Sequence, residues 1–392
     1  MLDVVILLAF GFAVAALVYT YLGYPLGVWW LSRRFSVPVA RGALLPSVTV
    51  VVIAHNEADQ IRRRLLNLLQ SDYPSDKLRI LVASDGSTDA TAKLARDTAS
   101  PRVRVKEFAR ARGKPAVLSE LVPNLATDYV VFADARQEFA PDAIRQLLSN
   151  FSDPDVGAVS GELKCGSLRG GLARGVGVYW RYEKMIRSAE SRMHSCVGVT
   201  GAIYALRTPL FRPIPDDILL DDVWIPMQVV RSGYRVIFEP RAVAYDPLET
   251  TPEREMQRKV RTIAGTFQWL ARQRWVLSPR HNPIWLQSVS HKGMRLAGPV
   301  FLAIAFGTNA ALAGPPLFTV LFGMQLAFYS MAAGGWLLQK LGRHSRFLAV
   351  PYAFCHLNVA TVVAFWRYVA GTQSVAWKVA GRRSSTAHVP WQ

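Results

Sequence analysis

The sequence predicts an α/β domain with a mostly parallel sheet, placed after one membrane-spanning helix and before about three more. Charged side chains are absent from three long apolar stretches, and the region between the first two alternates apolar strand-like runs with segments of helical periodicity. Composition agrees with this. Of 392 residues 51% are hydrophobic although the net charge is +18, whereas disordered chains reach such a charge by giving up hydrophobic residues. A disordered tail or a fibre is therefore excluded.

The three apolar stretches have the length of membrane crossings. No Asp, Glu, Lys or Arg occurs in Val4–Ser32, Leu296–Gln339 or Phe347–Trp366. Because one crossing needs about 20 residues, the first and third stretches provide one each. The second provides two, since the Gly314–Pro316 segment divides it. Buried core helices are the alternative, but they seldom run beyond about 18 residues without a charge.

Charges beside these stretches predict the orientation. Arg33, Arg34 and Arg41 follow the first stretch, which lacks a basic leader and is expected to stay as an anchor. The positive-inside rule then puts the domain in the cytoplasm, at a bacterial-type inner (plasma) membrane. Three later crossings would leave the C-terminus outside, so either the last segment is re-entrant or the tail breaks the rule, because the tail carries Lys378, Arg382 and Arg383.

These features divide the chain into five segments. They are an anchor (1–32), the α/β domain (45–250), basic amphipathic helices (251–295), the C-terminal spans (296–370) and a basic tail (371–392). Residues 251–295 interleave Arg and Lys with Trp, as helices lying in a membrane interface do, and an ordinary surface helix is the alternative. Membrane lipids are thus expected partners. Nucleic acid is not, because the basic residues cluster beside the spans and form no reading motif.

Within the domain, strands are expected at 48–54, 78–83 and 128–133, and helices at 59–70, with Asn56 as its cap, and 88–97. Ligands of parallel sheets bind at the carboxyl ends of the strands. Glu57, Asp85 and Asp134 follow the three strands, where carboxylates can accept hydrogen bonds from a base or ribose, or hold a divalent cation. Asp89 is equally well explained as a helix cap.

Six motifs in order carry a resemblance to a known family. They are V-V-I-A-H-N-E, V-A-S-D-G-S-T-D, R-G-K-P-A-V-L, V-F-A-D-A-R, V-T-G-A-I-Y-A-L-R and I-L-L-D-D-V. Flanked by spans, this series resembles the family 2 glycosyltransferases, in the membrane-bound group similar to cellulose, chitin and hyaluronan synthases. The resemblance implies a GT-A domain that binds a nucleotide sugar and transfers the sugar with inversion.

The resemblance also implies a donor site. Glu57 and Asp85 match residues that contact the nucleoside of the donor, here expected to be a UDP-sugar, and Lys114 matches a nearby position. Asp134 matches the first acid of a D-x-D motif that binds Mg²⁺ or Mn²⁺, but Arg136 replaces the second. Either the Arg136 guanidinium neutralises the diphosphate itself, or Asp134 holds the metal together with waters and phosphates. We favour a retained metal.

The pair Asp221-Asp222 matches the acidic pair of the family, whose second member is the general base. The reaction needs a base, because a sugar hydroxyl is a poor nucleophile until a carboxylate takes its proton. Acids favoured by a helix dipole are the alternative, which would leave Asp221 as a cap. Gly201 resembles part of an acceptor-side turn, where glycine lets the backbone approach a sugar; a plain tight turn explains it equally well.

Processive members of the family carry Q-x-x-R-W before the C-terminal spans. Here Arg258 and Thr262 replace Gln and Trp, and Arg261 keeps the Arg, so both arginines are implied substrate contacts. The aromatic sugar platform is missing unless Trp269 or Trp275 supplies it. We therefore expect transfer of one or a few sugars to a lipid-linked or growing glycan acceptor in cell-surface polysaccharide synthesis.

Two alternatives stay open. One is a processive polysaccharide synthase, for which the few spans would need an oligomer or an export partner to complete a channel. The other is a non-catalytic membrane scaffold derived from such an enzyme. Retention of Glu57, Asp85 and Asp222 argues against the scaffold.

Overall fold

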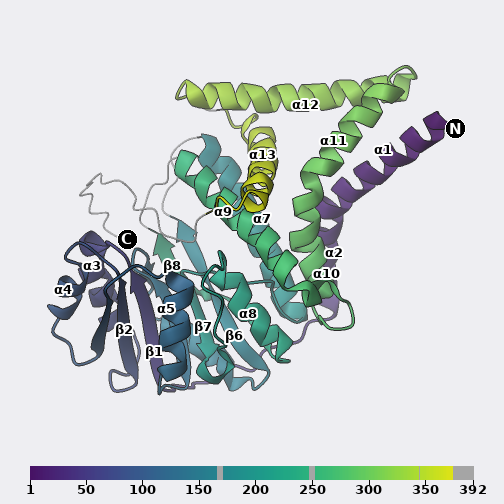
Figure 1. Ribbon diagram of the computed structural model, residues 1–392. Coiled ribbons are helices and arrows are strands. Elements are labelled where there is room, and N and C mark those ends of the chain that lie inside the picture. The colour runs from purple at the N-terminus through teal and green to yellow at the C-terminus, as the bar shows by residue number, and fades with distance from the viewer. Residues whose placement is uncertain (166–170, 247–251, 344, 374–392) are drawn as a thin grey trace.

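The computed structural model describes residues 1–165, 171–246, 252–343 and 345–373, without the side chains of 165, 171–179 and 252–254. The basic tail residues that bear on the membrane topology, Lys378, Arg382 and Arg383, are not among the described residues. Figure 1 shows a domain built around a sheet, with long helices extending from one side of it.

The domain contains a mixed sheet of eight strands within the described residues, in the order β3-β2-β1-β4-β7-β6-β8-β5. The pairs β1–β2, β1–β4, β2–β3 and β6–β8 are parallel, and the three pairs β4–β7, β6–β7 and β5–β8 are antiparallel. The predicted mostly parallel sheet is confirmed. The strands are β1 (Val48–Ala54), β2 (Leu78–Asp85), β3 (Val103–Phe108), β4 (Tyr129–Asp134), β5 (Glu138–Phe139), β6 (Val156–Cys165), β7 (Ile203–Arg207) and β8 (Arg235–Asp246).

Helices cover both faces of the sheet. Alternate residues of β1 point into two separate cores, which is why all seven of its residues are buried and why it is apolar throughout. One core holds α3 (Ala58–Leu69), α4 (Thr91–Arg96) and α6 (Ala143–Leu148). The other holds α5 (Lys114–Leu121), α8 (Asp221–Arg231) and Trp269 of α9 (Pro252–Arg272). The carboxyl ends of β1, β2 and β4 are thereby held side by side.

The start of α3 differs from the expectation. Asn56 does not cap it: Asn56 has a φ of 55° and its Oδ1 accepts the Thr88 N–H (2.8 Å). Asp89 accepts the first N–H of α3, from Ala58 (3.2 Å), with one oxygen and the Thr91 N–H at the start of α4 (3.0 Å) with the other. The predicted cap was therefore wrong, and Asp89 has a structural role at two helix ends.

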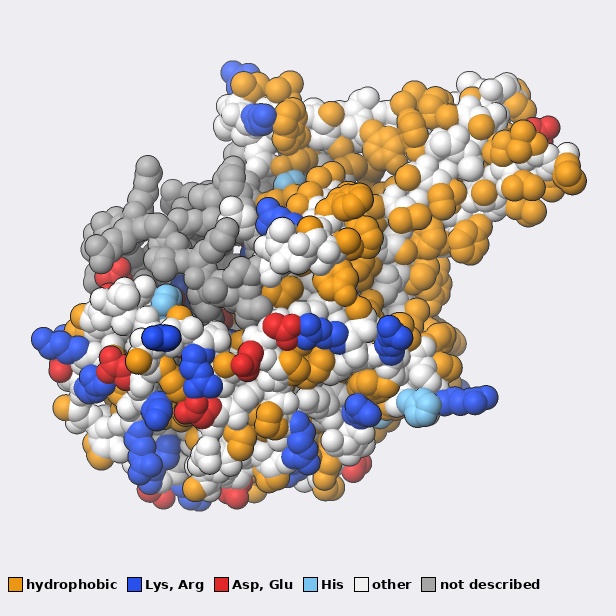
Figure 2. All heavy atoms as spheres, in the orientation of Figure 1, with side chains coloured by type: hydrophobic (Ala, Val, Ile, Leu, Met, Phe, Trp, Pro, Cys, Tyr) orange, Lys and Arg blue, Asp and Glu red, His pale blue; other side chains and the backbone are white. Residues whose placement is uncertain are grey.

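Four helical segments are long and apolar enough to cross a membrane: Leu2–Arg34, Trp285–Leu312, Pro316–Lys340 and Arg346–Val369. The first joins α1 (Leu2–Val18) to α2 (Tyr24–Arg34), and the others contain α10 (Trp285–Gln287) with α11 (Met294–Leu312), α12 (Pro316–Lys340) and α13 (Ala349–Val369). Figure 2 shows hydrophobic side chains over these helices and charged ones over the domain. One N-terminal and three C-terminal segments were predicted, and the chain is a membrane protein by this criterion.

The basic region 251–295 contains one long helix, α9, and the beginning of the second apolar segment. Several of its charges are paired with carboxylates of the protein. Arg258 pairs with Glu255 of its own helix (2.7 Å), Arg272 Nη1 bonds Asp217 Oδ1 (2.7 Å), and Arg295 pairs with Glu183. These three arginines are thus neutralised by protein carboxylates as well as being placed near the apolar helices.

A buried polar cluster joins α7 (Gly171–Met193) to the membrane helices. His291, in the π-helical turn Ser288–Gly293 before α11, contacts Glu183 Oε2 with Nε2 (3.0 Å) and Glu190 Oε1 with Nδ1 (2.9 Å). Tyr24 of α2 donates its hydroxyl to the same Glu190 oxygen (2.6 Å). Glu183 also pairs with Arg295 of α11. These contacts fix α7 against the ends of two membrane segments.

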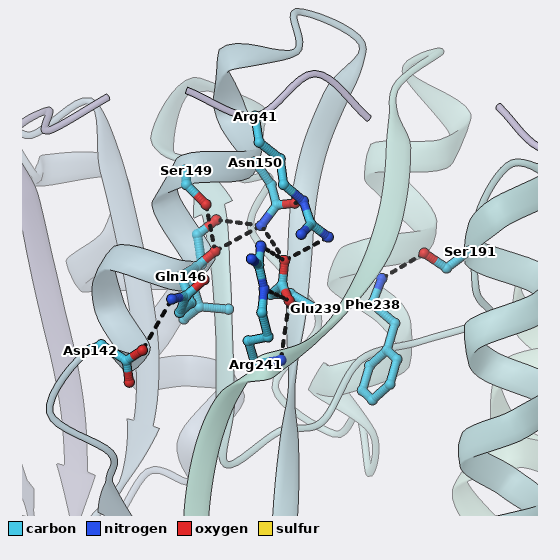
Figure 3. Close-up of polar contacts among 10 residues, drawn as sticks. Arg41, Asp142, Gln146, Ser149, Asn150, Ser191, Phe238, Glu239 and Arg241 are labelled. Carbon is cyan, nitrogen blue, oxygen red and sulfur yellow. Dashed lines mark hydrogen bonds and ion pairs between the residues drawn. The ribbon is translucent and has the colours of Figure 1, made fainter. Parts of the chain in front are cut away.

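The linker between α2 and β1 is bonded along the domain edge (Figure 3). Arg41 pairs with Glu239 Oε2 (2.9 Å) and donates to Asn150 Oδ1 (3.1 Å), and Arg241 binds the other Glu239 oxygen (3.0 Å). The fully buried Glu239 thus has two arginine partners. The backbone N–H of Gly42 also donates to Ser149 O (3.1 Å). The linker therefore follows a defined path over the domain.

Candidate active site

Asp85, at the end of β2, holds the loop that leads into α5. Its side chain is 1% exposed, and its two oxygens accept the backbone N–H groups of Arg112 (2.7 Å) and Gly113 (2.8 Å). Gly86 follows at a φ of 61°, and a Cβ there would lie 2.1 Å from Ala111 N, so only glycine fits. The D-G pair thus lets the loop pack directly on the strand end.

This loop places Lys114 at the first position of α5. Its Nζ lies 3.4 Å from Asp134 Oδ1 at the end of β4, and 3.2 Å from Asp221 Oδ2 at the start of α8. Burial alone would lower the pKa of Lys114, but the carboxylates of Asp221, Asp134 and Asp222 outweigh burial and raise it above its ordinary value. Lys114 is therefore a fixed positive charge among three acids.

Asp222 lies at the centre of the predicted site. One of its oxygens, Oδ1, is buried and accepts no hydrogen bond within the described residues, and Oδ2 faces Gly201, where a Cβ would lie 3.0 Å away. The Asp222 carbonyl accepts the Val199 N–H (2.8 Å), which ties α8 to the same turn. The glycine at position 201 thus lets a backbone turn pack directly against the carboxylate.

The surroundings of Asp222 make it a weaker acid. Burial and the neighbouring Asp221 raise the pKa of Asp222 from 3.8 to about 6, although Lys114 and Arg261 act in the opposite direction. A carboxylate with a pKa near neutrality is suited to accept a proton in catalysis. The same surroundings would not be needed for a helix cap, which works best as a fully ionised group.

One face of α9 holds the segment that leads into the acid pair. Gln268 accepts the Leu219 N–H with Oε1 (2.9 Å) and donates to Asp217 O with Nε2 (2.9 Å). Gly265 leaves only enough room for Leu220, since a Cβ there would lie 2.4 Å from Leu220 Cγ. Arg261, one turn earlier, is exposed and approaches Leu219 O (3.5 Å). Arg261 is thereby brought within electrostatic range of Asp222.

Glu57 and Arg136 lie near each other and near Asp134. Burial raises the pKa of Glu57, while the nearby Arg136 guanidinium lowers it and Asp134 raises it further. Arg136 therefore adds positive charge at the rim of the acid cluster. A carboxylate at this position would instead have faced Glu57 and Asp134 at close range, which is unfavourable without a cation.

The remaining predicted residues are less closely associated with this cluster. Arg258 forms its ion pair with Glu255, and among the described contacts none links it to the acids. Trp269 is 2% exposed and donates to Gln273 (3.1 Å), and Trp275 packs against the same core. The buried Trp269 is therefore not placed to stack on a sugar, and Trp275 is partly buried. Thr262 is exposed and donates to the Arg258 carbonyl (3.0 Å), as an ordinary helix residue does.

The structure thus brings seven predicted residues into one region: Glu57, Lys114, Asp134, Arg136, Gly201, Asp221 and Asp222. Asp85 supports them through the loop, and Arg261 lies within electrostatic range. Sequence reasoning missed the roles of Gly86 and Gly113, for which the D-G and G-K pairs were the signal. No motif marked Arg187 of α7, which donates to Thr200 Oγ1, next to Gly201 (2.9 Å).

The acids of this region do not form a complete site for Mg²⁺ or Mn²⁺ by themselves. Among the described residues no group of three or more His, Cys, Asp or Glu side chains could hold a metal ion. The Asp134 side chain is 23% exposed, and Lys114 contacts it through Oδ1. Mg²⁺ often takes one or two carboxylates and completes its shell with waters and substrate phosphates. The residues therefore fit a metal ion that binds together with a diphosphate. Without the diphosphate, the described residues form no complete metal site.

Metal binding should accordingly depend on nucleotide. Titration of Mn²⁺ into the protein alone should give no saturable binding, because Lys114 already neutralises Asp134 and the described residues form no group of three or more metal ligands. Titration in the presence of UDP, corrected for Mn²⁺ binding to free UDP, should give saturable binding that Asp134→Asn abolishes. Calorimetry or the electron paramagnetic resonance signal of free Mn²⁺ measures this. Saturable binding without nucleotide would contradict the one-carboxylate site.

The sheet order and the acid cluster at its strand ends define a GT-A domain carried on membrane helices. Residues 49–207 match the family "Glycosyl transferase family 2", and residues 129–338, more than half of the chain, match "Glycosyl transferase family group 2". The chain belongs to family 2 of the glycosyltransferases. The family and enzyme class predicted from the motifs are thereby confirmed.

Curated relatives support this membership. The chain is 26% identical over 286 residues to an N-acetylglucosaminyltransferase of Neorhizobium galegae, which covers 68% of this chain and 64% of that protein. It is 26% identical over 245 residues to a poly-β-1,6-N-acetyl-D-glucosamine synthase of Staphylococcus aureus, covering 58% of this chain and 56% of that protein. The chain thus spans less than two thirds of the length of both relatives.

A solved structure shares the fold. A mannosyltransferase of Pyrobaculum calidifontis, in complex with GDP-Man and Mn²⁺, aligns with a TM-score of 0.71 at 23% identity. The alignment covers 92% of this chain and 99% of that one, so it includes the long helices as well as the sheet.

Proposed function

We propose that the chain is a membrane-bound inverting glycosyltransferase that moves a sugar from a nucleotide-sugar donor to a lipid-linked or growing glycan acceptor in cell-surface polysaccharide synthesis. The observation that carries the proposal is the setting of Asp222, enclosed by the Gly201 turn and flanked by Asp221 and Lys114. In this proposal the domain lies on the cytoplasmic side of an inner (plasma) membrane, as Arg33 and Arg34 at the end of α2 suggest.

The proposed reaction is a single displacement. An acceptor hydroxyl attacks the anomeric carbon from the face opposite the diphosphate, while Asp222 takes the hydroxyl proton. The new C–O bond forms as the bond to the diphosphate oxygen breaks, and the electron pair leaves with the nucleoside diphosphate. The cations Lys114, Arg136 and Arg261 lie near the acids, and they would stabilise the growing negative charge. Mg²⁺ or Mn²⁺ at Asp134 would add further positive charge there.

For the donor we propose a UDP-sugar, with Glu57 and the loop held by Asp85 at the nucleoside. Because the Asp85 carboxylate is enclosed and already accepts two N–H groups, it would act on the nucleoside through that loop. Both curated relatives carry N-acetylglucosamine in their names, so UDP-N-acetylglucosamine is the first donor to try. Arg258, which pairs with Glu255, would contact substrate only after that ion pair opens.

Transfer of one or a few sugars is favoured over processive synthesis. Of the two residues that could have replaced the missing platform, Trp269 is part of the core and Trp275 packs against it, partly buried. A processive synthase is the second candidate, because one relative is named as a polymer synthase. Product length, measured by gel filtration, separates them: short products support the proposal, and long polymer made by the purified protein alone contradicts it.

Nucleotide release tests the activity. From one of a panel of UDP-, GDP- and dTDP-sugars, the protein purified in detergent should release the nucleoside diphosphate of that donor, which is UDP for the proposed UDP-sugar. Release should be more rapid with Mn²⁺ and an acceptor-containing lipid extract. EDTA should abolish release. A protein that binds the nucleotides but releases none under all these conditions would be a scaffold, and the proposal would be wrong.

Activity should fall in acid as Asp222 becomes protonated. Because the pKa of Asp222 is raised to about 6, kcat should decline as the pH falls through this value, since only the ionised carboxylate can act as a base. Asp221→Asn should move this acid limb to lower pH, because it removes a negative charge that raises the pKa of Asp222. A kcat profile measured from pH 4.5 to 8 in both proteins, with ~0.5-unit steps, checks this. An acid limb that stays in place in Asp221→Asn would contradict the coupling.

A further inference from the structure

A residue outside every motif supports the turn that encloses Asp222. Arg187 of α7 donates from Nη1 to Thr200 Oγ1 (2.9 Å) and from Nη2 to Ser160 Oγ of β6 (2.6 Å). Ser160 Oγ also accepts the Thr200 N–H (2.9 Å). One guanidinium therefore fixes both the side chain of Thr200 and the hydroxyl that holds its backbone.

Thr200 is next to the glycine that faces the proposed base. A Cβ at Gly201 would lie 3.0 Å from Asp222 Oδ2 and 3.2 Å from Asp222 Cβ, so any shift of this backbone changes the space around the carboxylate. Val199, on the other side of Thr200, donates its N–H to the Asp222 carbonyl (2.8 Å). The Val199–Gly201 turn thus contacts Asp222 at two points, and Arg187 holds the residue between them.

Arg187 itself is held rigidly. Its guanidinium lies over the Phe238 ring, 4.9 Å from the centroid. Glu183 lies one turn before Arg187 on α7 and Glu190 one turn after it. Both contact His291 in the buried polar cluster that joins α7 to the membrane helices. The guanidinium therefore approaches the turn from a helix that is anchored at both neighbouring turns. A bidentate arginine on such a helix is suited to set position within fractions of an ångström.

We propose that Arg187 is a positioning residue for catalysis, which keeps the Val199–Gly201 turn closed over Asp222 and so sets the position and solvent exposure of the base. This inference rests on the proposed function, because it needs Asp222 to be the base. Arg187 touches neither the acids nor, on this proposal, the donor; it acts through Thr200 and Ser160.

Arg187→Ala should lower kcat by about 10²-fold, since a misplacement of about 1 Å can cost that much. The Kd for UDP should be unchanged. The acid limb of the kcat profile should also move to lower pH, because an open turn admits water and burial is what raises the pKa of Asp222. A residue needed only for folding would reduce the fraction of active protein without moving the limb.

Two milder variants keep the test decisive if Arg187→Ala does not fold. The lysine of Arg187→Lys can reach one of the two hydroxyls, and Thr200→Val removes one of them. Both variants should therefore move the acid limb to lower pH, but by less than Arg187→Ala does. Lys184→Ala is the matched control, because Lys184 lies on the same helix and pairs with Glu162 at an exposed position (2.7 Å). It should leave kcat and the limb unchanged.

An unmoved limb and a normal kcat in Arg187→Lys and Thr200→Val would overturn the inference. Failure of the proposed function looks different: Asp222→Asn would then keep its activity, whatever Arg187 variants do. A weaker UDP affinity in Arg187→Ala, with the limb in place, would also overturn the inference, since it would assign Arg187 to the donor site.

Discussion

Asp222→Asn should reduce kcat by about 10²–10⁴-fold, the contribution of a positioned general base. Asparagine has nearly the same size, so it can occupy the space against Gly201 without moving the turn. It cannot accept the hydroxyl proton. Affinity for the nucleotide should be retained, because Lys114 keeps its contacts with Asp134 and Asp221. Steady-state kinetics together with UDP binding by calorimetry separates the two effects.

The control for this experiment is Asp221→Asn. It removes a charge from the same helix turn but leaves the proposed base in place, so activity should persist with an altered pH profile. Activity close to that of the unmodified protein in Asp222→Asn would refute the assignment of the base. Loss of UDP affinity in the same variant would show that Asp222 serves donor binding.

Glu183→Ala should destabilise the protein by about 3–5 kcal/mol, the usual cost of removing one partner of a buried ion pair. Glu183 is 8% exposed and is shared by Arg295 and His291, so its removal leaves the Arg295 guanidinium without this partner at the junction of α7 and α11. The melting temperature in detergent, followed by tryptophan fluorescence, measures the change.

Lys184→Ala provides the comparison at the neighbouring position. Its ion pair with Glu162 is exposed, so the expected change is below about 1 kcal/mol. Equal melting temperatures for Glu183→Ala and the unmodified protein would mean that the junction is open to water, and that the buried cluster does not hold α7 to the membrane helices.

The sheet and the membrane segments could be predicted from the sequence because both depend on local composition. The run from Val48 to Ala54 is apolar throughout because both of its faces are covered, and it forms β1 with the expected bounds. The Gly314–Pro316 segment separates α11 from α12 as expected, and Pro316 is the first residue of α12, a position where proline loses no helical hydrogen bond. The acids at the strand ends were located by the same argument.

Long-range hydrogen bonds could not be predicted in this way. The N-terminus of α3 is capped by Asp89, 31 residues later, because the loops after β1 and β2 lie side by side. The local candidate, Asn56, bonds to Thr88 of that second loop. A propensity argument considers only neighbours in the chain and therefore chooses the wrong cap.

The roles of individual arginines and tryptophans also depended on the tertiary structure. Arg41 was interpreted as an inside charge beside the first span, whereas its guanidinium pairs with the buried Glu239. Trp269 lies in a basic segment whose composition is typical of a membrane interface. In the structure, however, its side chain packs in the core with Val276 and Ile284. In both cases the partner comes from a distant part of the chain.

The bonded linker has a consequence for how acceptors reach the enzyme. A domain on a free tether could swing and serve hydroxyls at many distances from the lipid, but residues 37–42 are fastened to Arg192, Ser149 and Glu239. Asp222, the proposed base, therefore keeps one height relative to α2. The enzyme would then select acceptors by the distance between their lipid anchor and their terminal sugar, in addition to the chemical identity of that sugar.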